Sequence, residues 1–564
     1  MVALVPHDAF EDEWQDIMED LQSSAPAARL QGVKELARIG YGADEAAGLL
    51  DDPSTEVRIG AIRAVGNSGI AGIEYLRRLQ EKAKRSSLEP KERVAAIQAI
   101  GTLGAATGSS DMLEPLLEDV NPDIVAAACV ALGSTGPATV SQKLIEKLSS
   151  VEVVVIVGAV QGLATLQEAT DAIVKLAKHA DSRVRAAVLE GLCATSSTTM
   201  AKHLGIIVEG LGSDSFVVRA AALRCLQKLG PDAAAAQGAQ IAKLLTASSP
   251  GVRCAALMAL ASLGQAVAAH AGGVEKLLED EGKDEGMLVM HAAGLEAKVE
   301  PGLRKVCCAA AVAVGSIKIE AAASSLSSRL ASTMDEELKM CCLDALAGLG
   351  TEGARHQEVI EALLEDSAPL VVAAALHALG ELAVATFPSA NAAMKVAEFL
   401  NHSHPAVKEA AAVAMSHMDS EATPYVELIV KLLADVSEKV QVAAIGALAG
   451  AGEMGEMYAA DVVRRMFSPS LAVRLCAIES MAKMTTRGPA YTDELVSILQ
   501  EPYEAMRLAA LNTLKAFGTK ALKPYEVEIA MAKQECSSQV GDVVDAILAD
   551  LNAQKAAIQG DSES

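Results

Sequence analysis

The chain has 564 residues, of which 51% are hydrophobic and only 2% aromatic, and its 73 acidic and 48 basic side chains give a formal net charge of −25. An acidic chain repels phosphates on average, so the composition argues against nucleic-acid binding. The acidity either attracts basic protein surfaces or keeps a long apolar-rich chain in solution.

Residues 1–24 predict an acidic capping helix, because they contain seven acids and no Lys or Arg. Their apolar side chains, Phe10, Trp14, Ile17 and Leu21, fall on one helical face that would cover the first structural unit. The alternative is a docking helix for a partner. The acidic start argues against a signal or transit peptide, and the lack of a run of about twenty apolar residues argues against a membrane span.

Residues 25–265 predict a first array of repeats. The clearest copy, Asp52–Gly69, begins with an Asp-Pro helix start and continues with an apolar helical stripe from Arg58 to Gly66. We use Arg58 as the marker of this frame. The same frame returns at Arg93, Val125, Ile156, Arg185, Arg219 and Arg253, about one marker in every thirty-odd residues. Such a period with helical spacing indicates stacked helix pairs.

Residues 266–302 interrupt the rhythm, since 54 residues separate Arg253 from the next marker, Cys307. The segment is acidic and punctuated by glycines. We expect an insertion loop that includes Glu279, Asp280, Glu281, Asp284 and Glu285. Inserted loops of repeat proteins often lie on a working face, but a neutral surface insertion or an irregular joint between two arrays fits equally well.

Residues 303–535 resume the period as a second array. The markers here are Cys307, Lys339, Val372, Lys408, Gln441, Arg474 and Arg507. Residues 536–552 read as a C-terminal capping helix, and residues 553–564 as a disordered tail.

The recurring frame, two leucines, an acid and then Val-Arg before alternating Ala and aliphatic residues, is seen whole in Leu49–Gly66. It resembles the short HEAT repeats of the phycobilisome-lyase type in the armadillo-like superfamily. The resemblance implies an all-α fold, an α-solenoid of about fifteen stacked helix pairs with capping helices at both ends.

In the HEAT pattern, a turn acid and an Arg at the start of the second helix form a ladder of charged hydrogen bonds between neighbouring units. Asp52 and Arg58 match both positions. The bases of the expected structural ladder are Arg58, Arg93, Arg185, Arg219, Arg253, Arg474 and Arg507, with Lys339 and Lys408 as weaker substitutes. Val125, Ile156, Cys307, Val372 and Gln441 depart from the pattern.

A variable row of residues lies five positions after each marker, beside rows that are consistently apolar, and such a row should face outward. In HEAT-like solenoids second helices line a concave surface, so by resemblance this row would line a partner-binding groove. The expected groove residues are Arg63, Gln98, Gln161, Glu190, Arg224, Asp344, His377, Glu479 and Asn512. The alternative is that these side chains are only solvated.

Catalytic motifs for phosphate, dinucleotide, zinc-protease or hydrolase chemistry are absent from the sequence, so we expect no enzymatic activity. There is also no His-Glu dipeptide of the kind that binds iron in one HEAT-like enzyme family. The ten cysteines show no CxxC spacing, and we interpret them as buried small hydrophobes in a cytoplasmic protein, without metal or other cofactors.

The sequence therefore favours a non-enzymatic scaffold that binds one or more proteins, with basic surfaces as candidate partners, within a larger assembly. One alternative is a transport-receptor-like binder of basic peptides, although Trp14 is the only tryptophan and importins of the armadillo type use a repeated Trp array. Another is a chromophore lyase that acts together with a partner, as in some phycobilisome-related relatives.

Overall fold

The computed structural model describes residues 7–104, 108–136, 138–167, 170–284, 305–386, 390–501, 503–533 and 538–562. The regular elements within these ranges are α-helices and short 3-10 helices. They form two compact units. The first holds the described residues up to Gly273 together with 282–284, and the second holds Val274–Glu281 and the described residues from 305 onward.

In the first unit, each repeat has a broken first helix and a straight second helix. The second helices are α2 (Pro26–Ile39), α4 (Thr55–Asn67), α7 (Pro90–Leu103), α9 (Pro122–Thr135), α11 (Val153–Thr165), α13 (Ser182–Ala194), α16 (Phe216–Leu229) and α19 (Pro250–Leu263). The first helices and connecting turns are α1 (His7–Gln22), α3 (Ala43–Gly48), α5 (Ile70–Ile73), α6 (Leu76–Lys84), α8 (Ser110–Leu113), η2 (Glu114–Glu118), η3 (Ala138–Val140), α10 (Ser141–Lys147), α12 (Thr170–Val174), η4 (Lys175–Lys178), α14 (Ser197–Lys202), α15 (Leu204–Leu211), α17 (Pro231–Ala234), η5 (Ala235–Gln237), α18 (Gly238–Lys243), η6 (Leu244–Thr246) and η7 (Gly264–His270).

The second unit repeats this plan. Its second helices are α21 (Val306–Ile317), α23 (Glu336–Gly348), α26 (Pro369–Ala385), α28 (Pro405–Ser416), α30 (Glu438–Gly450), α33 (Leu471–Met481) and α35 (Glu504–Phe517). The other elements are η8 (Glu275–Glu279), η10 (Glu320–Ala322), α22 (Ala323–Ser332), α24 (Thr351–Ala354), α25 (Gln357–Ala362), η11 (Leu363–Glu365), α27 (Ala390–Glu398), η12 (Phe399–Asn401), η13 (Asp419–Tyr425), α29 (Val426–Leu432), α31 (Gly452–Glu456), α32 (Ala459–Arg465), η14 (Gly488–Tyr491), α34 (Thr492–Ile498), α36 (Thr519–Leu522), η15 (Lys523–Tyr525), α37 (Glu526–Met531) and α38 (Ser538–Ser562).

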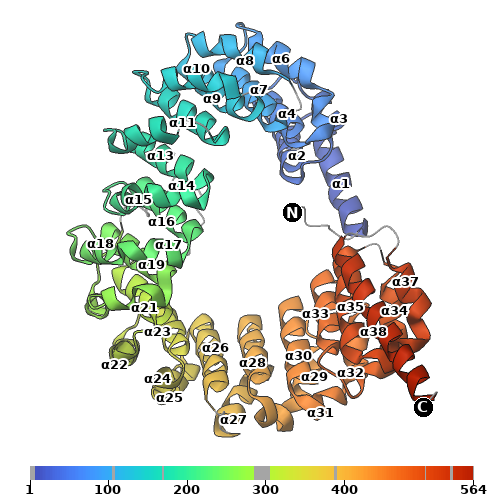
Figure 1. The fold of residues 1–564 in the computed structure, drawn as a ribbon. Coiled ribbons are helices and arrows are strands. Elements are labelled where there is room, and N and C mark those ends of the chain that lie inside the picture. The colour runs from blue at the N-terminus through green and yellow to red at the C-terminus, as the bar shows by residue number, and fades with distance from the viewer. Residues whose placement is uncertain are drawn as a thin grey trace. The chain divides into compact units, whose positions relative to one another are not determined.

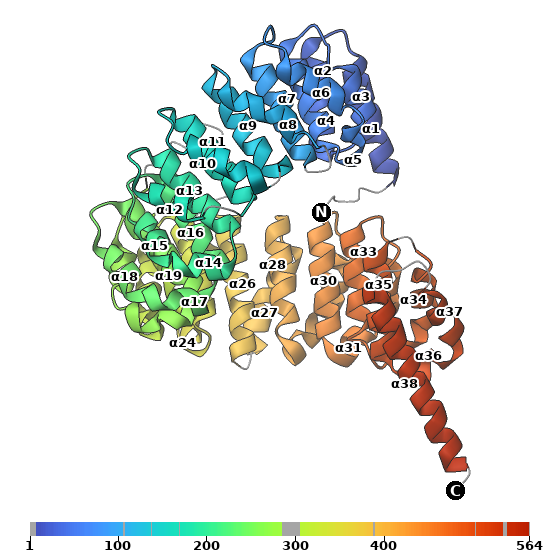
Figure 2. The same ribbon diagram turned by 45° about the horizontal axis from the view of Figure 1, so that its top comes forward.

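Within each unit the second helices pack side by side in chain order, each against the next (Figure 1). The first helices form the outer layer of the same unit. Figure 2 shows four second helices of the second unit, α26, α28, α30 and α33, as a row of adjacent helices. Many second helices begin with Pro at their first position, where its missing amide hydrogen costs nothing. Alanines dominate the buried faces, so neighbouring helices can approach closely.

Glycines bring α9 and α11 into backbone contact. A β-carbon added to Gly158 would lie 2.6 Å from the carbonyl oxygen of Ala126, and one added to Gly162 would overlap the carbonyl oxygen of Cys129. Gly133 on α9 faces Gly162 in the same way. Only glycine allows two helix backbones to approach this closely, so these three residues set the distance between α9 and α11.

A ladder of ion pairs links neighbouring repeats, with a base near the start of one second helix and an acid in the following repeat. Arg93 Nη2 donates to Asp119 Oδ2 at 2.8 Å, and Lys339 Nζ donates to Asp366 Oδ2 at 2.6 Å. Further pairs are Lys305–Asp335, Lys408–Asp435 and Arg474–Glu501. The acid often caps its own turn as well, as Asp366 accepts the Ala368 N–H at 2.9 Å.

Asp52 and Arg58 each pair with a neighbouring repeat, as the HEAT pattern implies for a turn acid and a helix-start base. Asp52 accepts hydrogen bonds from Arg29 of the preceding repeat, at 2.7 and 3.1 Å. Arg58 donates to the carbonyl oxygen of Asp52 at 2.9 Å and to the buried carboxylate of Glu92 at 2.8 Å. These rungs therefore run forward from a base to the next repeat, since the guanidinium reaches across the helix interface.

The other expected rungs are held in two ways. Arg185, Arg219 and Arg253 each donate Nη1 to two carbonyl oxygens of their own turn, at 2.7–3.0 Å. The Nε of Arg507 is buried and has no hydrogen-bond partner among the described residues. Lys305, two residues before the marker Cys307, supplies the base that the frame lacked at that point.

The acids of the predicted insertion loop are placed in contacts within one unit or the other. In the second unit Glu279 and Glu281 pair with Arg329, and the carbonyl oxygen of Asp280 accepts the Cys307 N–H. In the first unit Asp284 is buried and pairs with Arg219 at 2.5 Å. Glu285 lies outside the described residues. Glu279, Glu281 and Asp284 thus pair with arginines of the arrays, because a buried guanidinium requires a counter-charge.

The ends of the arrays are covered by α1 and α38. On α1, Ile17 and Leu21 are buried against α2, and the rings of Trp14 and Tyr41 meet edge to face with centroids 5.4 Å apart. The side chain of Phe10 lies outside the described part. The helix α38 packs on α35 and continues to Ser562, beyond the predicted end at 552, so the prediction of a disordered tail from 553 differs from the structure. The segment Asn552–Ile558 is rich in Ala, Gln and Lys, which favour helix.

One helical stretch in the described ranges, Pro250–His270, is long and apolar enough by composition to cross a membrane, with a mean hydropathy of 1.5. Half of it is buried inside the first unit, where α19 packs against α16. Its apolar character is accounted for by these core contacts.

Replacing Gly162 with Ala should lower the free energy of unfolding by about 1–3 kcal/mol, because the added methyl group overlaps the carbonyl oxygen of Cys129. The same substitution at Gly446 in α30 has nothing within 4 Å of the new β-carbon. It should leave stability unchanged or raise it by up to about 1 kcal/mol, since Ala favours helix. Urea unfolding followed by circular dichroism compares the two. Equal effects would contradict the contact between α9 and α11.

The pKa of Asp366 lies below its ordinary value, chiefly because its carboxylate accepts the hydrogen bond from Lys339. A carboxyl whose pKa is lowered by folding stabilises the fold above about pH 4 and loses that contribution as the pH falls. Asp366→Asn keeps an oxygen for the Ala368 N–H but removes the charge. It should reduce the unfolding free energy by about 1–3 kcal/mol at pH 7.

That difference between Asp366→Asn and the native chain should shrink towards zero by about pH 3, where the native carboxyl is also largely protonated. Urea midpoints measured between pH 3 and pH 7 test this. A loss of stability that did not change with pH would show that the ion pair contributes nothing.

Candidate protein-binding surface

The nine residues of the predicted groove row are all exposed. They lie on the second helices α4, α7, α11, α13, α16, α23, α26, α33 and α35. Their chain neighbours are mostly buried. Ile62 and Ala64, which flank Arg63, are buried, and so are Ile97 and Ala99, which flank Gln98. The row therefore forms the open edge of each second helix, as period-3.6 spacing requires.

One ion pair joins members of this row on neighbouring helices. Arg224 Nη2 donates to Glu190 Oε1 at 2.8 Å, and both side chains remain about half exposed, so a partner could displace the pair at little cost. The pKa of Asp344 is raised because the surrounding helices desolvate its carboxylate, and the nearby His377 offsets part of that shift.

The row has different charge in the two units. Its members in the first unit are Arg63, Gln98, Gln161, Glu190 and Arg224, which carry one more positive than negative charge. Its members in the second unit are Asp344, His377, Glu479 and Asn512, which carry two negative charges with neutral histidine. A basic surface is therefore better complemented by the second unit.

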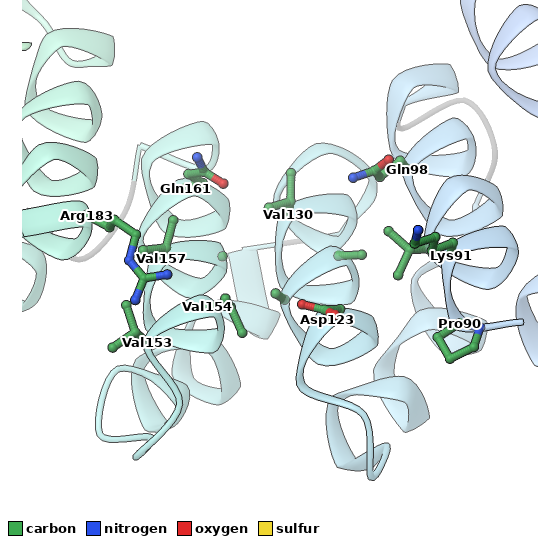
Figure 3. A pocket seen from close by; sticks show the side chains of 14 residues that line it. Pro90, Lys91, Gln98, Asp123, Val130, Val153, Val154, Val157, Gln161 and Arg183 are labelled. Carbon is green, nitrogen blue, oxygen red and sulfur yellow. The ribbon is translucent and has the colours of Figure 1, made fainter. Parts of the chain in front are cut away.

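A pocket of about 570 Å³ opens between α7, α9 and α11 in the first unit (Figure 3). Two residues of the predicted row, Gln98 and Gln161, lie on its edge with Val130 between them. The walls are valine side chains, and the floor is made of small residues, Ala126, Ala127 and Gly158. The wall valines are Val94, Val130, Val153, Val154 and Val157, all half-buried. We call this pocket the valine groove.

Sequence reasoning placed Gln98 and Gln161 on an outward row but did not find the valine groove. The available signal was the sequence of α9 and α11, in which Asp123 is the only charged residue. The markers on these helices, Val125 and Ile156, are both buried and uncharged, so the ladder of ion pairs is interrupted where the surface is apolar. The depth of the groove depends on helix spacing, which a repeat pattern does not contain.

The described cysteines are mostly buried thiols. Six of them are buried, and burial raises the pKa of the Cys129 and Cys342 thiols to about 12, which keeps them protonated at neutral pH. The doublets Cys307-Cys308 and Cys341-Cys342 stand on the neighbouring helices α21 and α23. No group of three His, Cys, Asp or Glu in the described ranges is arranged to hold a metal ion.

Comparisons with known proteins agree with this architecture. Residues 425–515 match the family of HEAT repeats. A crystal structure of importin beta is similar with a TM-score of 0.64 and 14% identity, over 100% of this chain and 90% of that one. Yeast importin-beta, Kap95p, gives 0.57 and 11%, over 98% and 92%. The karyopherin Kap121p bound to Pho4p gives 0.57 and 12%, over 95% and 69%.

No curated protein sequence matches the chain. At identities below 15% the structural likeness speaks for the fold alone. It confirms the predicted fold class, and the match to residues 425–515 agrees with the resemblance noted in the repeat frame.

Proposed function

We propose that this chain, an all-α solenoid of HEAT-like repeats, is a non-enzymatic scaffold that binds protein partners through the exposed row of its second helices. The observation that carries the proposal is the row itself. Nine polar residues on nine second helices are exposed beside neighbours that are almost all buried. Each repeat thus keeps its core and presents a different side chain to a partner.

The second unit is the better candidate for a basic partner. Asp344 and Glu479 lie open on its row, and the chain carries a net charge of −25, so a positively charged surface is attracted at long range and matched on contact. The likeness to Kap121p bound to Pho4p supports a protein partner, because a solenoid of similar fold holds another protein in that complex. The cytoplasmic location expected from reduced cysteines remains a prediction.

A transport-receptor-like role is a second candidate, favoured by the likeness to importin beta over the whole chain. It shares the same surface but requires release of the partner, whereas a scaffold retains it. The half-exposed Arg224–Glu190 pair is compatible with both roles, since it is weak enough to open for either partner.

The row is tested by reversing its charge. Asp344→Lys with Glu479→Lys should reduce the recovery of co-purifying proteins at least tenfold when the tagged full chain is isolated from its own cells. The matched control is Glu358→Lys with Glu427→Lys, which makes the same charge change at exposed sites on the first helices α25 and α29. The control should retain every partner.

Circular dichroism and thermal unfolding establish that both double variants are folded. Loss of the partners in the control but not in the row variant would place binding on the outer layer of helices. A native chain that is always recovered alone would refute the scaffold proposal.

A further inference from the structure

We infer that the valine groove binds an extended, uncharged segment of a partner protein with aliphatic side chains at alternate positions. The inference rests on the proposed protein-binding function and adds a specific ligand class for the first unit. Four properties of the groove support it: apolar surface left open, a floor of small residues, two uncommitted carboxamides and a neutral interior.

The first property is that the apolar surface of α11 is left open. The helix has no charged residue, yet Val153, Val154 and Val157 are only half-buried. A helix that is apolar on every side is normally covered, and valine is a weaker helix former than alanine. Val151, in the turn just before α11, is 93% exposed, and Val120, just before α9, is fully exposed. Apolar side chains are thus exposed both in the groove and on the turns that precede its helices, and clustered exposed apolar surface is typical of binding sites.

The second property is the shape of the groove. Ala126, Ala127 and Gly158 form a floor without bulky side chains, and valines of α7, α9 and α11 stand around it. The close contact of α9 with α11 through Gly158 fixes this floor. A volume of about 570 Å³ accommodates several aliphatic side chains but no folded domain. The site therefore fits a short segment.

The third property is the pair of carboxamides on one edge, Gln98 and Gln161 (Figure 3). Neither side chain makes a hydrogen bond within the part of the chain that the structure describes. Each can both donate and accept, as the main chain of an extended peptide requires. In a helical segment the main-chain N–H and C=O groups are already hydrogen-bonded to one another, so they do not need the two carboxamides. Gln98 and Gln161 stand two helix spacings apart, roughly 16–20 Å, which five or six extended residues span.

The fourth property is the charge of the lining. Lys91 and Asp123 offset each other, and Arg183 is neutralised by Asp181, to which its Nη2 donates at 2.9 Å. The interior between them carries no charged side chain. A charged side chain placed there would lose hydration without gaining a counter-ion. An uncharged aliphatic segment is therefore favoured over a basic one, in contrast to the second unit.

The inference is tested with fluorescent ten-residue peptides and fluorescence anisotropy on the full-length chain. A peptide of alternating valine and serine should bind. A peptide with lysine in place of each valine, and a valine-free peptide of alanine and serine, should each bind at least tenfold more weakly. Preference for the lysine peptide would overturn the inference, as would equal binding of all three.

Variants then locate the site. Val157→Asp, which adds a charge to the groove wall, should weaken binding of the valine-serine peptide at least tenfold. Val436→Asp is the matched control at a fully exposed turn of the second unit, and it should bind as the native chain does. Val157→Thr preserves shape and serves if Val157→Asp is unfolded by circular dichroism; it should weaken binding about threefold. Unchanged affinity in folded Val157 variants would refute the groove as the site.

Gln98→Ala with Gln161→Ala tests the extended conformation, and it should weaken binding about tenfold. A helical alanine-leucine peptide that bound more tightly than the valine-serine peptide, with no effect of the glutamine changes, would overturn that part of the inference. The outcome is separable from the proposed scaffold function. A chain that retains its cellular partners but does not bind the valine-serine peptide contradicts this inference alone. A chain that binds the peptide but is always recovered without partners contradicts the scaffold proposal alone.

Discussion

The structure depends on a charged hydrogen bond that crosses from one repeat to the next. A base near the start of a second helix, such as Arg93 or Lys339, reaches a carboxylate of the following repeat. The same carboxylate can cap its own turn, as Asp366 does, so one acid fixes both the turn and the register of two helices. These pairs are largely buried, where a charge without its partner is costly, and this cost favours the observed packing of each repeat on the next.

The ladder lapses on α9 and α11, where the marker positions hold Val125 and Ile156. Helix contact replaces it there, because Gly133, Gly158 and Gly162 let the two backbones touch. The chain thus uses two devices to hold neighbouring repeats. Glycine contacts also occur beside charged pairs, as Gly66 meets Ala99 and Gly101 meets Ala131, but between α9 and α11 they act without a rung of the ladder.

Much of this could be predicted from the sequence because a repeat fixes periodicity. The exposure of Arg63 and Gln98 followed from their place in the frame. What depends on contacts outside the frame could not be predicted. Arg219 pairs with Asp284, which lies 65 residues further along the chain, and no repeat spacing indicates that partner. The valine groove was missed for the same reason, since its depth is set by the distance between helices.

The glycine contact has a consequence for recognition. Because α9 and α11 touch through their backbones, the floor of the groove at Gly158 has no side-chain rotamers to rearrange. The surface is already in its binding shape when the partner arrives, so conformational entropy is lost mainly by the incoming segment. The groove then binds its ligand without changing its own conformation. Differences in affinity between related ligands should appear chiefly in their dissociation rates.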